Sequence, residues 1–273
     1  MHRPPCHHRN GLTRFARRIA GVLGLLLVSI SLLAQLPTQA DAPVVAARLD
    51  ALKESIAADL TARLSTNAVR GSYTTVWRQF EDAAIVALKE ILPQHIPRVS
   101  VADFTSGAAG REKNRLADFA IICGTNTIEI SIKAARASGQ PENDLGTFRD
   151  HGNRRKLFAA AFTVWVRYLD SGETLRAERV FFDRTWRFVG KSSQVDGVKY
   201  RKKDGNMRPK PWSMFETSAS FWKTQEEFES AVKRAETFRA NELVKEYLNE
   251  LSEEDQRLLH DRLHEKFERR VRP

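Results

Sequence analysis

Apolar residues recur at intervals of three and four along several stretches of the chain, which predicts amphipathic helices there. In the first stretch, Leu49, Ile56 and Leu60 fall on one side. Pro93 and Pro97 are expected to end the second helix, because proline lacks the backbone N–H that a helix interior needs. The predicted helices cover residues 44–64, 73–92, 145–160, 224–251 and 252 onward.

Two apolar, β-rich runs lie within residues 116–136, separated by the turn-forming sequence Gly-Thr-Asn, which predicts a hairpin. Residues 162–168 form another clear strand, and residues 179–183 return alongside it. Helices before, between and after strands predict an α+β fold. We expect a central mixed β-sheet with flanking helices and a helical C-terminal extension.

The second strand of the hairpin carries functional groups on one face. Residues two apart in a strand share a face, so Glu129, Ser131 and Lys133 lie together, and three isoleucines occupy the other face. Asp118, on the first strand, can lie alongside them. Two carboxylates and a lysine at one place in a sheet are costly unless something binds there. A divalent cation with a phosphate would satisfy all three.

This arrangement resembles the active site of the PD-(D/E)xK nuclease superfamily, over residues 77–212. The resemblance implies a restriction endonuclease-like core that cleaves DNA with Mg²⁺. Asp118 and Glu129 would bind the metal, and Lys133 would position or activate the attacking water.

The sequence departs from the family pattern at two positions. Ala117 stands where the family often has proline, and Ser131 stands where the second acid is expected. Some family members carry serine there and recruit the carboxylate from elsewhere. Glu129 or Glu142 could supply it here. A helix before the first core strand often adds a glutamate to the metal site, which makes Glu81 a further candidate ligand, although a surface role for Glu81 remains open.

Residues 184–211 are rich in cations, with aromatic residues interleaved. Basic side chains neutralise phosphates and aromatic rings can stack on unpaired bases, so this segment predicts contact with nucleic acid. The alternative is a solvated basic loop. Arg201 and Arg208 are expected to be the best phosphate or base contacts, because a guanidinium can donate two parallel hydrogen bonds. The basic residues are Arg184, Arg187, Lys191, Lys199, Arg201, Lys202, Lys203, Arg208 and Lys210.

The N-terminal segment is apolar over residues 19–36 and follows five arginines. This pattern predicts a signal peptide or a membrane anchor within residues 1–40, inserted with its basic end inside. The protein would then be exported or membrane-tethered, and cytoplasmic if translation starts downstream of Met1. The whole chain has a net charge of +10, which suits a polyanionic partner.

Together these patterns predict an N-terminal segment, a nuclease-like domain over residues 44–222 and a helical extension over residues 223–273 that could be a homodimer contact. The two cysteines, Cys6 and Cys123, exclude a paired-cysteine zinc site. The leading hypothesis is a Mg²⁺-dependent DNA endonuclease. The alternative is a non-catalytic, exported or membrane-tethered protein that binds polyanions through residues 184–211, with Glu129 and Lys133 as a simple ion pair.

Overall fold

The structure is a computed structural model of the chain, which forms two compact units, residues 1–40 and 41–273. The structure describes residues 42–66, 68–69, 76–97, 99–103, 117–123, 126–148, 151 and 161–271, without the side chains of 68–69 and 264–271. The apolar run 19–36 and most of the expected helix 145–160 lie outside these residues. Within them, no helix is both long enough and apolar enough to cross a membrane.

The second unit is organised on a six-stranded sheet in the order β1-β6-β5-β4-β3-β2. Neighbouring strands are antiparallel except β4 and β5, which are parallel. The sheet is therefore mixed, and the predicted α+β class is confirmed. The strands are β1 (Ala68–Val69), β2 (Ser100–Asp103), β3 (Phe119–Cys123), β4 (Asn126–Arg136), β5 (Phe162–Asp170) and β6 (Thr174–Arg184).

The predicted hairpin is present as β3 and β4, and the predicted strand pair as β5 and β6. Ile128, Ile130 and Ile132 are fully buried on one face of β4, as the alternation of the sequence requires. The return strand β6 begins at Thr174, earlier than expected. Strand β2 was not predicted, because its four residues are too short to show a period.

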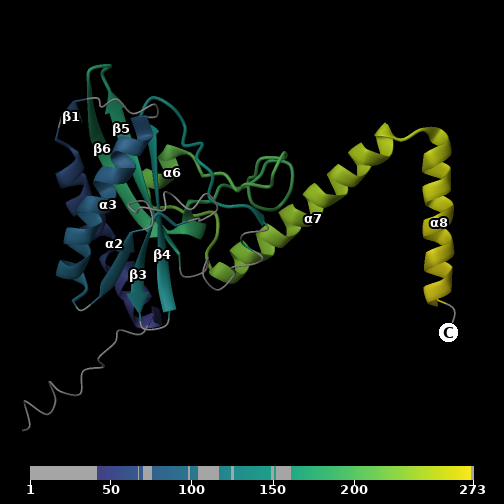
Figure 1. Cartoon of the computed structure of the whole chain (residues 1–273), viewed down its shortest axis with the longest axis horizontal. Coiled ribbons are helices and arrows are strands. Elements are labelled where there is room, and N and C mark those ends of the chain that lie inside the picture. The colour runs from purple at the N-terminus through teal and green to yellow at the C-terminus, as the bar shows by residue number, and fades with distance from the viewer. Residues whose placement is uncertain are drawn as a thin grey trace, which may run out of the picture. The chain divides into compact units, whose positions relative to one another are not determined.

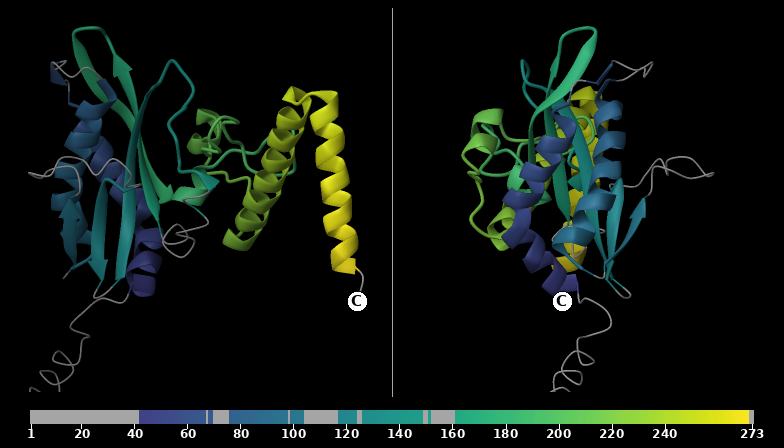
Figure 2. Two further views of the ribbon diagram at one scale, coloured as in Figure 1. Left: turned by 45° about the vertical axis from the view of Figure 1, so that its right-hand side comes forward. Right: turned by 90° about the vertical axis from the view of Figure 1, so that its left-hand side faces the viewer.

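Helices α2 (Ala42–Leu64) and α3 (Val76–His95) cover this isoleucine face, on one side of the sheet (Figures 1 and 2). The ring of Phe80 on α3 stacks on Tyr168 of β5 with centroids 4.8 Å apart. The predicted end of the second helix at Pro93 is wrong, since Pro93 lies inside the last turn of α3. A proline so close to the end of a helix disturbs few of its hydrogen bonds.

The opposite face of the sheet supports a second core, rich in aromatic rings. Trp165 and Phe181 project from β5 and β6 and meet Trp212 and Phe215 of the short helix α6 (Trp212–Glu216). The 3-10 helix η1 (Thr185–Phe188) contributes Trp186 and Phe188 to the same core. This core lies on the same face as Lys133, because Lys133 is in register with Trp165.

Helix α7 (Gln225–Glu250) begins at a capped residue, because the Thr224 hydroxyl accepts from the N–H of Glu227. Its first turns belong to the aromatic core through Phe228 and Val232. Further along the helix, Val244 is 57% exposed, so the core contacts of α7 belong to its N-terminal part. Helix α8 (Glu253–Val271) follows and completes the helical C-terminal part.

Candidate active site and basic segment

The hairpin positions the carboxylate of Asp118, which lies immediately before β3. Its backbone N–H donates to the carbonyl of Ile130 at 3.2 Å. Its Oδ2 accepts from the backbone N–H of Ile132 at 2.8 Å and faces the Ser131 hydroxyl at 3.4 Å. Strand β4 thus holds this residue in place, through its backbone and its side chain.

The lysine of the predicted motif lies beside this carboxylate. The Nζ of Lys133 is 3.9 Å from Oδ2 of Asp118, and the two side chains are 19% and 18% exposed. This is an ion pair at the long end of the range, partly shielded from water. An ammonium that is held but not tightly bound can still interact with a further anion.

Glu129 lies on the same face of β4, in register with Ala120 of β3, and is 9% exposed. The structure therefore places Asp118, Glu129, Ser131 and Lys133 on one face of the hairpin. Within the described residues, no three histidine, cysteine or acidic side chains form a metal-binding group. Whether these residues bind metal stays a prediction.

The two additional glutamates are placed differently. Glu81 is 3% exposed on α3, the helix that covers the isoleucine face, whereas Lys133 projects from the opposite face. Its placement does not favour a ligand role. Glu142 is exposed in the loop after β4, where its backbone carbonyl accepts from Arg208.

The two arginines expected to contact DNA are bound within the protein. The guanidinium of Arg201 donates to Asp144 at 2.9 Å and to Asp204, and that of Arg208 donates to Asp144 at 2.8 Å. The Arg201 guanidinium holds the pKa of Asp204 well below its usual range. Asp144 therefore connects both arginines. Sequence reasoning missed it, because an acid in a polar loop gives no signal of its distant partners.

Four other cations of the segment also have carboxylate partners. The pairs are Arg184 with Asp50, Arg187 with Asp183, Lys191 with Asp196, and Lys202 with Glu246. Ion pairs of this kind reduce the charge available to a phosphate backbone. Lys199 and Lys203 are exposed, and within the described part of the chain no carboxylate lies within salt-bridge distance of either.

Lys210 does not fit the expected role in DNA contact. It is 3% exposed, and its Nζ donates to the carbonyl of Ala219 and lies over the rings of Phe188 and Phe215. The prediction that Lys210 contacts nucleic acid is corrected, because the aromatic core encloses its ammonium group. Nothing in the sequence distinguishes this lysine from its exposed neighbours.

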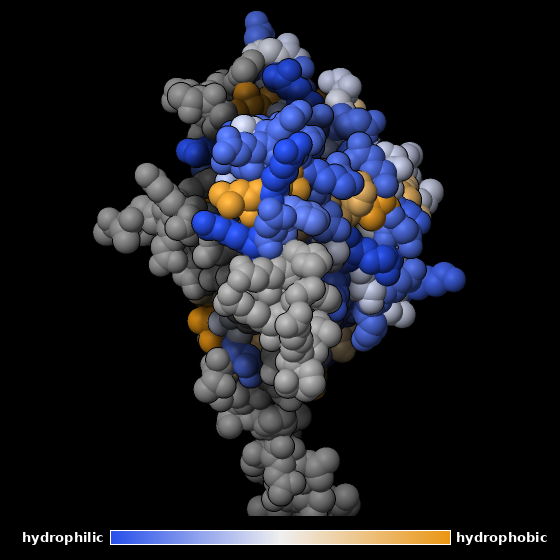
Figure 3. All heavy atoms as spheres, turned by 90° about the vertical axis from the view of Figure 1, so that its right-hand side faces the viewer, coloured by the Kyte–Doolittle hydropathy of each residue, from blue (hydrophilic) through white to orange (hydrophobic). Residues whose placement is uncertain are grey.

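One face of the molecule is mostly hydrophilic, with small and separate apolar areas (Figure 3). Large exposed apolar patches mark protein-binding surfaces, whereas scattered apolar residues are ordinary. The coloured apolar residues on this face are therefore of the ordinary, scattered kind.

No protein-family model and no curated protein matches this chain. Among solved structures, the chain is similar to NlaIV restriction endonuclease, with a TM-score of 0.44 and 12% identity, covering 66% of this chain and 77% of that one. A TM-score this low is too weak to assign a family. The class of the protein, an α+β fold on a mixed sheet, follows from its own strand order and helices.

Proposed function

We propose that this protein is a Mg²⁺-dependent DNA endonuclease that hydrolyses phosphodiester bonds. The observation that supports it most is the position of Lys133, whose Nζ lies 3.9 Å from the Asp118 carboxylate on the face that also carries Glu129. A lysine and two acids on one partly buried face lose solvation, and a bound cation with a phosphate would compensate for that loss.

The donor set fits Mg²⁺. Mg²⁺ prefers oxygen ligands and is commonly held by one or two carboxylates, with water and substrate phosphate completing its shell. All bonds that the described residues make with the Asp118 carboxylate use Oδ2, which leaves Oδ1 for a cation. Glu129 supplies the second carboxylate in place of the acid missing at Ser131. When bound, the metal would polarise the phosphate and lower the pKa of a water.

Lys133 has a defined role in this proposal. Asp118 keeps the ammonium group of Lys133 near the carboxylates without enclosing it. The positive charge of Lys133 can therefore stabilise the negative charge that develops on the phosphate oxygens. Ser131 adds a weak contact, because its hydroxyl lies 3.4 Å from Oδ2 of Asp118. Asp118 itself orders the strand, since it accepts from the N–H of Ile132.

Contact with the DNA backbone is assigned to Lys199 and Lys203, the exposed cations of the basic segment that have no described carboxylate within salt-bridge distance. Each phosphate neutralised by a lysine releases counterions, so binding should weaken as salt rises. With about two such contacts, a log–log plot of affinity against salt should have a slope of roughly −2.

The test is cleavage of plasmid and genomic DNA of several base compositions by the full chain, with Mg²⁺ or with EDTA. We expect cleavage that requires Mg²⁺ and falls by roughly 100- to 1,000-fold in Lys133→Ala, because one electrostatic group is removed. Asp118→Asn should also abolish cleavage while keeping the hydrogen bond from Ile132. The matched control is Lys89→Ala, which breaks a different lysine–aspartate pair, with Asp103.

The second candidate is a non-catalytic protein that binds polyanions, exported or tethered through residues 19–36. One observation favours this candidate: among the described residues, no three histidine, cysteine or acidic side chains form a metal-binding group. Asp118 and Lys133 would then be a simple ion pair. A folded protein that binds DNA but cleaves no source with Mg²⁺ or Mn²⁺ would establish this candidate. Cleavage unaffected by Lys133→Ala would contradict the proposed site.

A further inference from the structure

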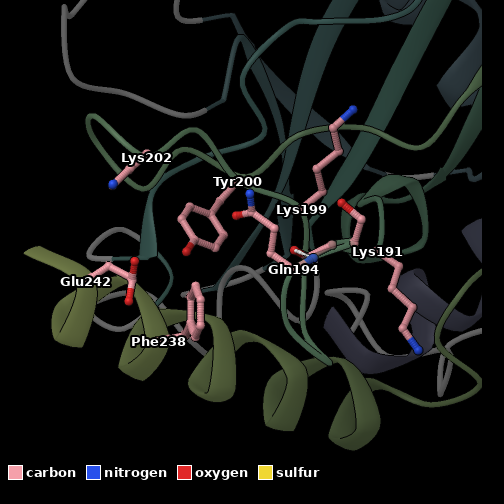
Figure 4. Close-up of a pocket in the computed structure, with 9 residues that line it drawn as sticks. Lys191, Gln194, Lys199, Tyr200, Lys202, Phe238 and Glu242 are labelled. Carbon is pink, nitrogen blue, oxygen red and sulfur yellow. Dashed lines mark hydrogen bonds between the residues drawn. The ribbon is translucent and has the colours of Figure 1, made fainter.

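A cleft of about 690 Å³ lies between the segment 191–202 and helix α7 (Figure 4). Its volume is within the range typical of sites for small molecules. None of its lining residues comes from β3 or β4, so it is separate from the hairpin of Asp118 and Lys133. Its main side chains are Lys191, Gln194, Lys199, Tyr200, Lys202 and Phe238.

The two walls of the cleft are fastened together at one end by a close backbone contact. A Cβ on Gly197 would lie 2.8 Å from the carbonyl oxygen of Ala231 and 3.0 Å from Cβ of Ala235, so only glycine allows this approach. Arg234 of α7 also donates to the backbone carbonyl of Asp196 and pairs with its carboxylate.

The other end is fastened by Arg239 of α7. Its guanidinium donates to the carbonyl of Lys202 at 2.8 Å and to that of Lys203 at 3.1 Å. The segment between these ends is also ordered, because the N–H of Lys199 donates to Gly190 at 2.6 Å and its carbonyl accepts from Arg208 at 2.8 Å. The cleft is therefore formed before any ligand binds.

Two aromatic rings from opposite walls are exposed to the cleft. Tyr200 comes from the basic segment and Phe238 from α7, and Figure 4 shows Gln194 beside Tyr200. Phe148 packs edge-on against Tyr200 with centroids 5.1 Å apart, which fixes the tyrosine ring. Rings presented in this way bind flat heterocycles by stacking. The amide of Gln194 can donate to and accept from the edge of such a heterocycle.

The cleft also has a surplus of positive charge, with three lysines against Glu242. Lys191 and Lys202 have carboxylate partners in Asp196 and Glu246. Lys199, in contrast, has no carboxylate within salt-bridge distance among the described residues. Its ammonium is therefore the charge most available to an anionic group, and Figure 4 shows it directed away from the two rings, so it is reached by a phosphate that extends beyond them.

We propose that this cleft binds a phosphorylated nucleoside, with the base against Tyr200 and Phe238 and the phosphate at Lys199. The ligand could be a free nucleotide or an unpaired nucleotide within a nucleic acid strand, which share this chemistry. The inference does not depend on the proposed cleavage, since binding is measured in EDTA and requires none of Asp118, Glu129 or Lys133.

The experiment uses the full chain and fluorescence anisotropy of a labelled, 5′-phosphorylated single strand of about eight nucleotides, within the site size of known single-strand binders. AMP, dTMP and the corresponding nucleosides serve as competitors. Phe238→Ala should weaken binding by roughly 10- to 100-fold, because one stacking ring is lost. The matched control is Tyr247→Ala, an exposed aromatic on the same helix that does not line the cleft.

Lys199→Ala tests the phosphate contact. It should weaken binding of the phosphorylated ligands several-fold and leave competition by the nucleosides unchanged, whereas Lys223→Ala, an exposed lysine outside both the cleft and the basic segment, should leave nucleotide competition unchanged. Gln194→Ala, in an exposed loop, provides a further variant that should fold normally. Circular dichroism of every variant confirms the fold.

Each result decides a point. Displacement of the strand by AMP or dTMP identifies a free nucleotide as sufficient, and dependence on Phe238 without such displacement identifies an unpaired strand. Failure of wild-type protein to bind any of these probes would overturn the proposal. Equal losses in Phe238→Ala and Tyr247→Ala would do the same. Cleavage of plasmid by the same preparations is scored separately, so the two proposals can fail independently.

Discussion

Burial of the ammonium group of Lys210 should make the stability of this protein depend on pH in an unusual direction. Nζ lies 5.5 Å from the ring centroid of Phe188 and 5.3 Å from that of Phe215. Burial, assisted by the nearby charges of Arg187 and Lys53, lowers the pKa of Lys210 from 10.5 to about 8, although Asp183 opposes the change. The folded state therefore holds this proton less tightly than the unfolded state does.

The size of the effect follows from the two pKa values. One pKa unit is worth about 1.4 kcal/mol, so charging Lys210 costs the folded state about 3 kcal/mol. Below about pH 8 both states bind the proton and the full cost is present. Between that pH and 10.5 the unfolded state binds more protons, so stability rises with pH, and above 10.5 the cost is gone.

The assay compares urea unfolding of wild-type protein with that of Lys210→Met from pH 7 to pH 10. Methionine removes the charging cost but leaves the Ala219 carbonyl without its donor, a loss of roughly 1 to 2 kcal/mol. The variant should therefore be more stable than wild type by about 1 to 2 kcal/mol at pH 7. This advantage should shrink and then reverse as pH rises.

The control is Lys203→Met, whose side chain is exposed and whose difference from wild type should not change with pH. Loss of stability in Lys210→Met at pH 7, or a difference that stays constant to pH 10, would refute the reasoning. Either result would mean that the aromatic rings compensate fully for the buried charge.

Two further predictions concern packing. Gly197→Ala should destabilise the protein by roughly 1 to 3 kcal/mol in urea unfolding, because the added Cβ would meet the backbone of α7. The control Gly139→Ala should not destabilise it, since open space surrounds that residue. Equal effects of the two changes would contradict the close approach at Gly197. Thr163→Val should cost about 1 to 2 kcal/mol, because the Thr185 hydroxyl, 2.9 Å from that of Thr163, would lose its buried partner; thermal unfolding that matches wild type would show that the pair contributes nothing.

The sheet could be predicted from the sequence to the extent that its strands alternate. The isoleucines of β4 define a buried face, and the sequence Gly-Thr-Asn predicts a turn between two strands, so the common face of Glu129, Ser131 and Lys133 was predictable. Strand β2 and the end of α3 could not be predicted from the sequence. The first is too short to show a period, and the second depends on how well a helix end tolerates Pro93.

The basic segment shows where sequence reasoning lost accuracy. A run of cations predicts an available positive surface only when its counter-charges are known. Arg201 has a local partner in Asp204, but Asp144 lies 57 residues from Arg201 and Asp50 lies 134 residues from Arg184, so acids that are distant in the sequence also neutralise these groups. Lys210 was misassigned because its burial depends on the rings of Phe188 and Phe215, and the sequence does not show that these rings pack against it.

The same geometry bears on what Asp118 does. As a structural residue, its carboxylate accepts from the N–H of Ile132 and pairs with Lys133, and both interactions use Oδ2. Asparagine would preserve the first interaction through its amide oxygen and lose only the long charge pair with Lys133, which is partly shielded from water and worth about 1 kcal/mol. As a metal ligand, the same change would remove a charge that amide oxygen cannot replace. Asp118→Asn therefore separates the two roles, since little loss of stability combined with complete loss of cleavage is expected only if the carboxylate binds metal.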